Sequence, residues 1–128
     1  MAVGVICFYS LLKYLKKFFS LLLFFLFFQG FYMSVMVSVE FPVQTGKMVS
    51  FLEFIAKALP ATRAFDGCLK VETFAEDGGG SLILIEAWET LDHQKAYMKW
   101  RMDTGLMAAL EPFVSGPPIV RSYQPSDA

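Results

Sequence analysis

Cysteine, histidine and charged residues are scarce in this chain of 128 residues. The two cysteines, Cys7 and Cys68, lie far apart and match no spacing typical of a metal site, a redox motif or a disulfide-built secreted fold. Charged residues make up 18% of the chain and the net charge is -1, so nothing indicates the basic face of a nucleic-acid-binding protein. The sequence therefore predicts no metal site and no nucleic-acid partner, and its 55% hydrophobic content excludes intrinsic disorder.

Acidic residues are absent from the first 35 positions. Those positions hold three lysines, giving +3, and eight of the 14 phenylalanines, whereas residues 36–128 hold all 12 acids against eight Lys and Arg, giving -4. The apolar excess of the whole chain is therefore concentrated at one end. We expect a hydrophobic N-terminal extension over residues 1–33, one small α+β domain over 34–124, and a frayed tail over 125–128.

Two interpretations of the extension stay open. Phe18 to Val39 contains no charge and is long enough to cross a bilayer as a helix, with the preceding lysines keeping the N-terminus cytoplasmic. In that case the protein is a single-pass membrane protein, and a membrane is a partner. Alternatively, translation starts at Met33 or Met36, the extension is dispensable and the protein is cytoplasmic. The predicted first strand follows with almost no linker, which favours the second interpretation.

Residues 34–123 show alternating strand and helix patterns. Alternation with β-branched residues predicts strands over 34–41, 68–75, 82–88 and 119–123. Helical spacing predicts a helix that ends or kinks at Pro60, with Thr45 as its cap, and Pro60 can also open a short second turn through Phe65. A second helix is predicted from Thr90 or Asp92 to about Asp103, followed by a short turn over 106–110. Glu76 to Ser81 reads as the turn of a hairpin.

The order β-α-β-β-α-β is that of a ferredoxin-like α+β fold, with both helices on one face of a four-stranded sheet. The third predicted strand begins Leu82-Ile83-Leu84-Ile85 and is apolar on both faces. This pattern predicts a central strand covered on both sides. We expect a second copy of the chain to cover the face that the helices leave open, giving a homodimer.

Two short motifs carry a resemblance to a known family. Ala64-Phe65-Asp66-Gly67-Cys68 resembles the small-x-x-Gly-Cys turn of the antibiotic biosynthesis monooxygenase (ABM) domain family, and Glu86-Ala87-Trp88 is similar to the Glu-x-Trp of that family's third strand. The resemblance covers roughly residues 35–123 and implies a dimeric α/β barrel. For some members it implies oxidation of quinols or polycyclic aromatic phenols by O2, without metal, haem or flavin. Other proteins of this fold have no known activity.

The second predicted helix carries the candidate catalytic residues. Many family members have a histidine about nine positions after the strand Trp, but Tyr97 stands there and the only histidine, His93, comes one turn earlier. His93, Tyr97, Trp100 and Arg101 share a helix face. His93 is a candidate base or a surface residue beside Asp92.

Each of the other candidates also has a structural alternative. Tyr97 and Trp100 either line an aromatic pocket or pack on the sheet. Arg101 either stabilises a phenolate or pairs with Asp103 or Glu111. Trp88, Glu86 and Arg121 are candidate substrate-binding residues on the strands. Trp88 would otherwise fill the barrel, and Glu86 would otherwise pair across strands with Lys70 or Arg121.

Two functions follow from these residues. The first is a cofactor-independent monooxygenase acting on a small aromatic phenol or quinol. The second is a non-catalytic dimer of the same fold that binds a small ligand or acts as a stress-associated module. The absence of the usual family histidine at Tyr97 is the feature that keeps the second open.

Overall fold

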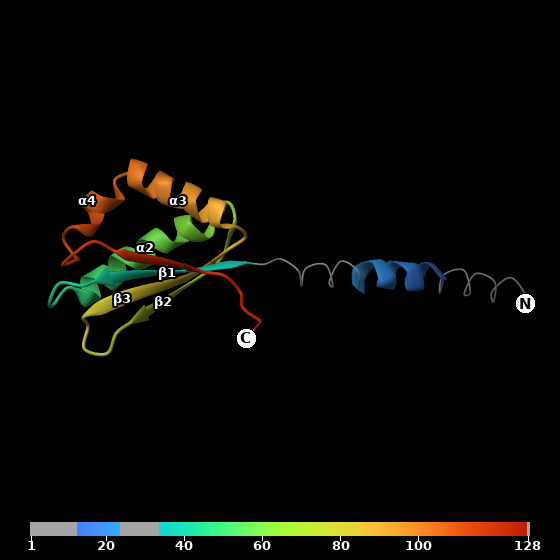
Figure 1. Ribbon diagram of the computed structural model, residues 1–128, viewed down its shortest axis with the longest axis horizontal. Coiled ribbons are helices and arrows are strands. Elements are labelled where there is room, and N and C mark those ends of the chain that lie inside the picture. The colour runs from blue at the N-terminus through green and yellow to red at the C-terminus, as the bar shows by residue number, and fades with distance from the viewer. Residues whose placement is uncertain (1–12, 24–33, 128) are drawn as a thin grey trace, which may run out of the picture. The chain divides into compact units, whose positions relative to one another are not determined.

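A computed structural model describes residues 13–23 and 34–127 of the chain (Figure 1). The chain divides into two compact units, Met1–Tyr32 and Met33–Ala128. Residues 13–23 are helical and their side chains are exposed within their own unit. No helix among the described residues is both long enough and apolar enough to span a membrane. Much of the predicted transmembrane stretch lies outside those residues, so the membrane anchor stays a prediction.

The second unit contains a four-stranded antiparallel sheet. Its strands are β1 (Val35–Pro42), β2 (Cys68–Ala75), β3 (Ser81–Trp88) and β4 (Ile119–Tyr123), in the spatial order β2-β3-β1-β4. The β2–β3 hairpin turns through the glycines predicted from the sequence, two of which have positive φ. β3 is a central strand, as its apolar run predicts. The ferredoxin-like α+β prediction is confirmed.

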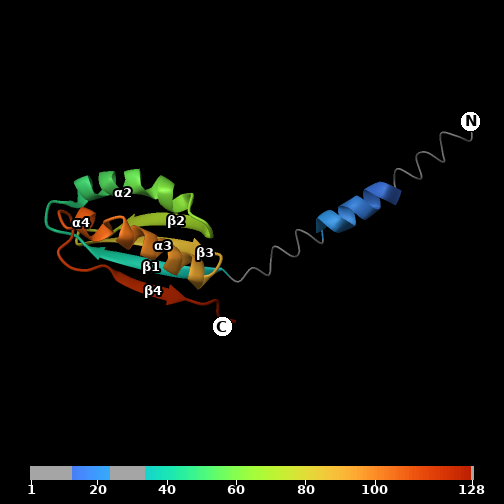
Figure 2. The same ribbon diagram turned by 90° about the horizontal axis from the view of Figure 1, so that it is seen from above.

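Three helices lie on one face of this sheet, as the two views in Figures 1 and 2 show: α2 (Met48–Arg63), α3 (Leu91–Asp103) and α4 (Leu106–Leu110). The core fills the space between these helices and the sheet. In β1 and β3 every second side chain is buried there, because successive side chains of a strand point to opposite faces. The buried apolar residues of these two strands are Val35, Val37, Val39, Phe41, Leu82, Leu84 and Trp88.

The ends of α2 differ from the prediction. The helix is capped at Lys47, whose side chain makes no capping hydrogen bond, so Thr45 is not the cap. Pro60 does not end the helix, which continues to Arg63. A proline removes only one backbone N–H, and the Ala64 amide still donates to the Pro60 carbonyl oxygen. The extra turn has a consequence for the site, because it contains Thr62.

The start of α3 agrees with the prediction. Thr90 is the N-cap, and its side chain accepts a hydrogen bond from the His93 amide. At the other end, Thr104 closes the helix and Gly105 follows with a φ of 90°, a conformation that glycine adopts without strain. The helix α4 then begins at once, so the chain turns back over the sheet before β4.

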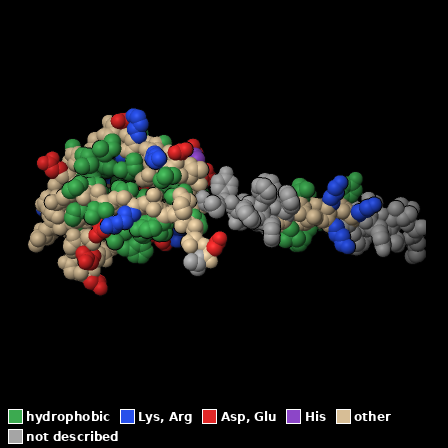
Figure 3. Space-filling model, in the orientation of Figure 1, with side chains coloured by type: hydrophobic (Ala, Val, Ile, Leu, Met, Phe, Trp, Pro, Cys, Tyr) green, Lys and Arg blue, Asp and Glu red, His purple; other side chains and the backbone are tan. Residues whose placement is uncertain are grey.

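None of the described helices of this unit lies on the opposite face of the sheet (Figure 1). Its large apolar side chains are about half exposed, and the described residues that form it include Met36, Phe74, Ile119 and Tyr123. Ile83 and Ile85 of β3 point the same way. We refer to this surface as the open face. In the view of Figure 3, hydrophobic side chains gather over the domain, and acidic side chains lie mostly at its margins.

Candidate functional site

A small cavity, which we call the inner cavity, lies between the covered face of the sheet and the helices. Its volume is about 40 Å³. Most of its walls are apolar, with Leu84 from the sheet, Ile55 from α2 and Met98 from α3 among them. Four side chains in its lining are polar: Thr62, Glu86, Tyr97 and Arg101. An apolar pocket with a few convergent polar groups is the usual form of a small-molecule site.

Three of the four polar side chains form one hydrogen-bonded group, the Arg101 cluster. The Arg101 guanidinium donates to the Tyr97 hydroxyl oxygen at 2.9 Å and to the Thr62 hydroxyl oxygen at 3.0 Å. The Tyr97 and Thr62 hydroxyls are 2.8 Å apart and share a further hydrogen bond. Arg101 also donates to the Ala58 carbonyl oxygen at 2.9 Å. The cluster therefore fixes a positive charge and two hydroxyls in the cavity wall.

The cluster forms because two helices meet there. Tyr97 and Arg101 are four residues apart and share one face of α3. Thr62 and Ala58 are four apart and share one face of α2. The alternative pairing of Arg101 with Asp103 or Glu111 is therefore wrong, since Asp103 bonds Lys99 instead and Arg101 bonds across to α2.

Glu86 is the fourth polar group of the inner cavity. Its side chain is 1% exposed, and it accepts a hydrogen bond of 2.8 Å from the Trp88 indole N–H. Burial raises the pKa of the Glu86 carboxyl above its ordinary value, and the Trp88 hydrogen bond and the Arg101 charge offset only part of this effect. Glu86 is thus a carboxyl that holds its proton more tightly than an exposed one.

The cross-strand alternative for Glu86 is wrong. The strand positions opposite it are Val37 and Val71, which point with it toward the helices. Lys70 lies opposite Ala87 on the open face, because a bulge between Cys68 and Lys70 sets the register of β2. Period-two alternation put Glu86 and Trp88 on one face correctly, but it does not say which face the helices cover.

Aromatic rings surround the buried end of the site. Trp88 is fully buried and its ring lies 5.1 Å from that of Tyr97, centroid to centroid. Phe65 packs on both of these rings and on Trp100. Trp100 is 36% exposed, and the Arg101 guanidinium lies 4.7 Å from its ring centroid. Tyr97 therefore packs in the core and also lines the cavity, whereas Trp100 packs on Phe65 and Tyr97 from the surface side.

His93 lies apart from the inner cavity, at the surface end of α3. Its Nδ1 is 2.7 Å from the Thr90 hydroxyl, and its Nε2 is 3.7 Å from Asp66 and 4.0 Å from Glu89. The ring covers Gly67, which has a φ of 82° and where a Cβ atom would collide with the imidazole. The Gly-Cys turn thus needs glycine for its backbone and for the space under His93.

Comparison with known proteins identifies the domain. The sequence model of the family described as antibiotic biosynthesis monooxygenase matches residues 34–101. The chain belongs to the ABM family. No curated protein shows significant sequence similarity to it. The family resemblance carried by the Gly-Cys turn and the Glu-x-Trp strand is therefore confirmed.

Solved structures share the ABM fold of this chain. A protein of unknown function from Nitrosomonas europaea matches with a TM-score of 0.65 and 20% identity, covering 76% of this chain and 93% of its own. The protein Rv0793 from Mycobacterium tuberculosis matches with a TM-score of 0.63 and 20% identity, over 74% and 97%. A monooxygenase of Streptomyces coelicolor, in complex with the ligand nanaomycin D, matches with a TM-score of 0.64 and 21% identity, over 75% and 90%.

Arg121 is the remaining predicted site residue of this ABM domain. It lies on β4 opposite Ser38, and its guanidinium is 3.4 Å from the Glu40 carboxylate. This pair is on the open face, so the structure does not bring Arg121 to the inner cavity. Of the seven predicted site residues, the structure brings Glu86, Trp88, Tyr97, Trp100 and Arg101 together and leaves His93 and Arg121 outside.

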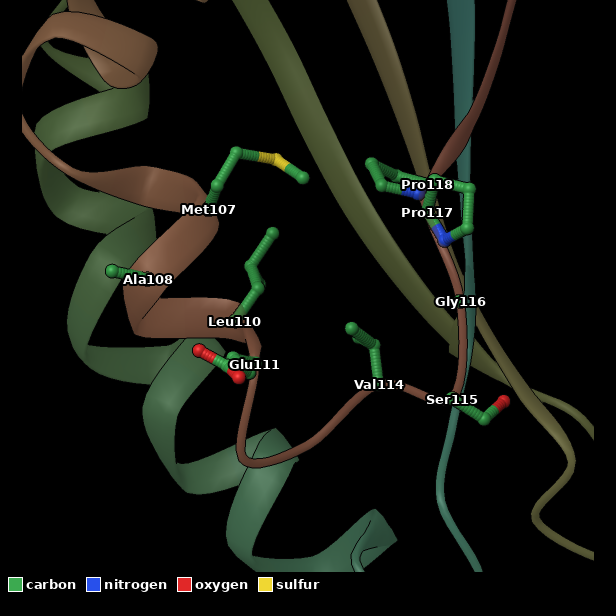
Figure 4. Close-up of a pocket in the computed structure, with 9 residues that line it drawn as sticks. All are labelled: Met107, Ala108, Leu110, Glu111, Val114, Ser115, Gly116, Pro117 and Pro118. Carbon is green, nitrogen blue, oxygen red and sulfur yellow. The ribbon is translucent and has the colours of Figure 1, made fainter.

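The structure adds site residues that sequence reasoning missed. Thr62 was missed because the sequence does not show which side of the turn after Pro60 meets α3. A second hollow, the outer groove, has a volume of about 620 Å³ and shares Leu110 and Pro118 with the inner cavity. Figure 4 shows Met107 of α4 reaching toward Pro117 and Pro118 on the opposite side of this groove. In the sequence, Gly116-Pro117-Pro118 indicated only a break in the chain, and nothing there predicted that this segment lines a groove.

Metal-ligating side chains do not gather in the described part of the chain: no group of three or more His, Cys, Asp or Glu there could hold a metal ion. Cys68 is a free thiol at intermediate burial, and burial, with Glu86 nearby, raises its pKa. It is therefore a poor nucleophile at neutral pH, since the thiolate is the reactive form.

Proposed function

We propose that this protein is a cofactor-independent monooxygenase that oxidises a small aromatic phenol or quinol with O2. The observation that carries the proposal is the Arg101 cluster, a guanidinium and two hydroxyls held at one wall of an otherwise apolar cavity. Such a site can bind an aromatic ring and favour its deprotonated, anionic oxygen. ABM family membership supports the reaction type.

The proposed chemistry draws its electrons from the substrate. Loss of the hydroxyl proton gives a phenolate, whose electron-rich ring reduces O2. One oxygen atom enters the ring to form a quinone, and the other leaves as water together with the two hydrogens that the substrate loses. Arg101 and the Tyr97 hydroxyl stabilise the phenolate oxygen, and the surrounding aromatic rings exclude water, which strengthens this electrostatic effect.

The substrate needs more room than the inner cavity offers. Ligand sites usually have about 300–1,000 Å³, against about 40 Å³ here. We propose that the substrate enters from the outer groove, with its hydroxyl toward Arg101 and the rest of the ring system between α4 and Pro117-Pro118. Leu110 and Pro118, which line both spaces, separate the two and have to move apart.

His93 was predicted as a base, but it does not line the inner cavity. For His93 to act as the base, a substrate hydroxyl would have to reach the surface beside Asp66 and Glu89.

Trp88 contacts the site through Glu86 and the Tyr97 ring, and we propose that it positions both side chains.

A second copy of the chain is proposed to cover the open face. Half-exposed apolar side chains there, such as Phe74 and Ile119, form a surface whose burial against a second copy would stabilise the protein. The Glu40–Arg121 and Lys70–Glu72 ion pairs lie on the same face and would sit within or at the edge of the contact. In this arrangement Arg121, paired with Glu40, contributes to the contact between the two copies.

Oxygen uptake with a panel of one-ring to three-ring phenols and quinols tests the function. We expect at least one to be consumed, and Arg101→Met to reduce kcat/KM by roughly 10²–10³, the usual effect of removing one group that stabilises an oxyanion. The control is Lys95→Met, which removes an exposed cation from the same helix. Absence of uptake across the panel, with the protein folded, would contradict the proposal.

The alternative is a non-catalytic module that binds a small aromatic ligand. The observation that favours it is Tyr97, which stands where many family members have a histidine and is hydrogen-bonded to Arg101 and Thr62. Thermal stabilisation by a phenol that the protein does not oxidise would support this function, and turnover of any panel member would exclude it.

A further inference from the structure

The buried carboxyl of Glu86 lines the inner cavity but takes no part in the hydrogen bonds of the Arg101 cluster. The Arg101 cluster stabilises a phenolate, but a phenol must first lose its proton, and neither a guanidinium nor a hydrogen-bonded threonine removes one at neutral pH. A base has to lie within hydrogen-bond reach of the substrate hydroxyl. Among the residues that line the inner cavity, Glu86 is the one with a carboxyl group.

The geometry points to Glu86 as the catalytic base that takes the phenolic proton, while Arg101 and Tyr97 hold the resulting phenolate. This inference rests on the proposed function and names the group that starts it. In the step, the substrate O–H bond breaks and its electron pair stays on the substrate oxygen. The proton forms a new O–H bond on the Glu86 carboxylate. O2 then oxidises the phenolate, and Glu86 returns the proton to the departing water.

Three features of the surroundings suit Glu86 to this role. Its side chain is buried in the cavity wall and does not rotate freely, because the Trp88 indole holds one carboxyl oxygen at 2.8 Å. Arg101 acts on it electrostatically across the cavity, yet the Arg101 hydrogen bonds go to Tyr97, Thr62 and Ala58. Glu86 is therefore not tied up in an ion pair that would remove its basicity.

The basicity of Glu86 fits its task. Burial raises the pKa of this carboxyl, which makes it a stronger base than an exposed glutamate. The titratable or charged groups that face it are Arg101 and Tyr97 from α3 and the Cys68 thiol from β2. The neighbouring positions on β1 and β2 are valines. The rate of proton removal should thus rise with pH as Glu86 loses its proton.

The first test compares the pH profiles of oxygen uptake for the wild type, Glu86→Gln and His93→Gln. Glutamine keeps an oxygen to accept the Trp88 hydrogen bond but cannot take a proton. We expect Glu86→Gln to lower kcat by roughly 10²–10⁴, the usual contribution of a positioned base, and to remove the acidic limb of the profile. Glu86→Asp should restore part of the rate. Glu53→Gln, an exposed acid on α2, is the matched control.

The results separate the two candidate bases. A Glu86→Gln enzyme with the wild-type rate and profile overturns the inference and leaves the proposed oxidation intact. Loss of the acidic limb in His93→Gln, with Glu86→Gln unaffected, also overturns it and assigns the base to His93.

A second measurement needs no turnover. A nitrophenol absorbs differently as phenol and phenolate, so titration of protein with nitrophenol reports proton transfer in the complex directly. In the wild type we expect a phenolate band without release of a proton to the solvent, because Glu86 keeps the proton that nitrophenol loses. In Glu86→Gln each phenolate formed in the complex should release one proton to the solvent, which a pH indicator or calorimetry in buffers of different ionisation enthalpy measures. Equal proton release in the two proteins, or no phenolate band in the wild type, overturns the assignment of Glu86 even if no panel member is oxidised.

Discussion

The two faces of the central strands β1 and β3 differ sharply, although the residues of both faces alternate along the same two strands. On the covered face, apolar side chains are buried and one polar residue, Glu86, lies among them at 1% exposure. On the open face, Met36 of β1 and the neighbouring Phe74 of β2 and Ile119 of β4 are about half exposed, beside ion-paired charges. The covered face is buried within one chain, and the open face is not.

This difference separates two tasks. A buried carboxyl and a partly buried guanidinium are costly to desolvate, and a fold keeps them only where they are well bonded or are used. On the covered face both are bonded, to Trp88 and to the Thr62–Tyr97 pair. The ion pairs of the open face are exposed and stabilise little. We therefore place chemistry on the covered face and association on the open face, and the following changes test that division.

The largest effect is expected on the covered face. Trp88→Ala removes a fully buried ring and the donor to Glu86, and should lower the free energy of unfolding by roughly 3–5 kcal/mol, as is usual for large aromatic residues in a core. Phe74→Ala, on the open face, should cost much less, because this side chain is about half exposed within one chain. Urea denaturation of both variants measures the loss of unfolding free energy in each. Equal losses would contradict the expected difference between the two faces.

The next effect belongs to the open face. Ile85→Lys places a charge at the centre of the proposed contact between copies, and burying an unpaired charge costs several kcal/mol. We expect the dissociation constant of the dimer to rise by about 100-fold or more, measured by sedimentation at several concentrations. Val49→Lys, on the exposed side of α2, is the control. A wild-type chain that stays monomeric at high concentration would refute the proposed interface.

A smaller effect is expected in the Arg101 cluster. Thr62→Val keeps the shape of the side chain but leaves the Tyr97 hydroxyl and one Arg101 N–H without this partner. An unsatisfied buried polar group costs roughly 1–3 kcal/mol, so stability should fall by about that amount, and KM for an active substrate should rise. Thermal melts and steady-state kinetics check both. Ser50→Ala, which removes an exposed hydroxyl of α2, should change neither.

The smallest effect is a pH-dependent difference in stability. Because the pKa of Glu86 is raised in the folded protein, the unfolded chain releases this proton first as the pH rises. The wild type should therefore lose stability relative to Glu86→Gln from acidic to neutral pH, starting at the ordinary pKa of a glutamate and ending above its folded pKa. Melts of the two proteins over this range measure the change, and a constant difference would contradict it.

Much of the fold could be predicted because it depends on local patterns. Alternation placed Glu86 and Trp88 on one face of β3, and helical spacing placed Tyr97 and Arg101 on one face of α3. Whether α2 ends or continues at Pro60 stayed open, because the continuation of a helix past a proline depends on the packing of its next turn. That turn supplies Thr62, whose place in the site depends on the contact between α2 and α3.

Which residues belong to the site could be predicted only in part, because this also depends on how the elements pack. Glu86, Tyr97 and Arg101 were candidates on their own elements, but the pairing of Glu86 with Lys70 and of Arg101 with Asp103 was equally consistent with the sequence. The register, shifted by the bulge in β2, excludes the first, and the contact of α3 with α2 excludes the second. His93 belongs to the same helix face, yet its ring packs on Gly67 instead.

The sequence by itself determined the order of elements and which side chains share a face of each strand or helix, since these follow from periodicities within about ten residues. The family followed from the resemblance of two short motifs and the match of the family's sequence model. Only the tertiary structure decided that Thr62, Glu86 and Arg101 meet around one cavity. These residues come from three separate elements, and their meeting depends on how the helices lie across the sheet. That arrangement is set by the packing of the whole core, which no local pattern encodes.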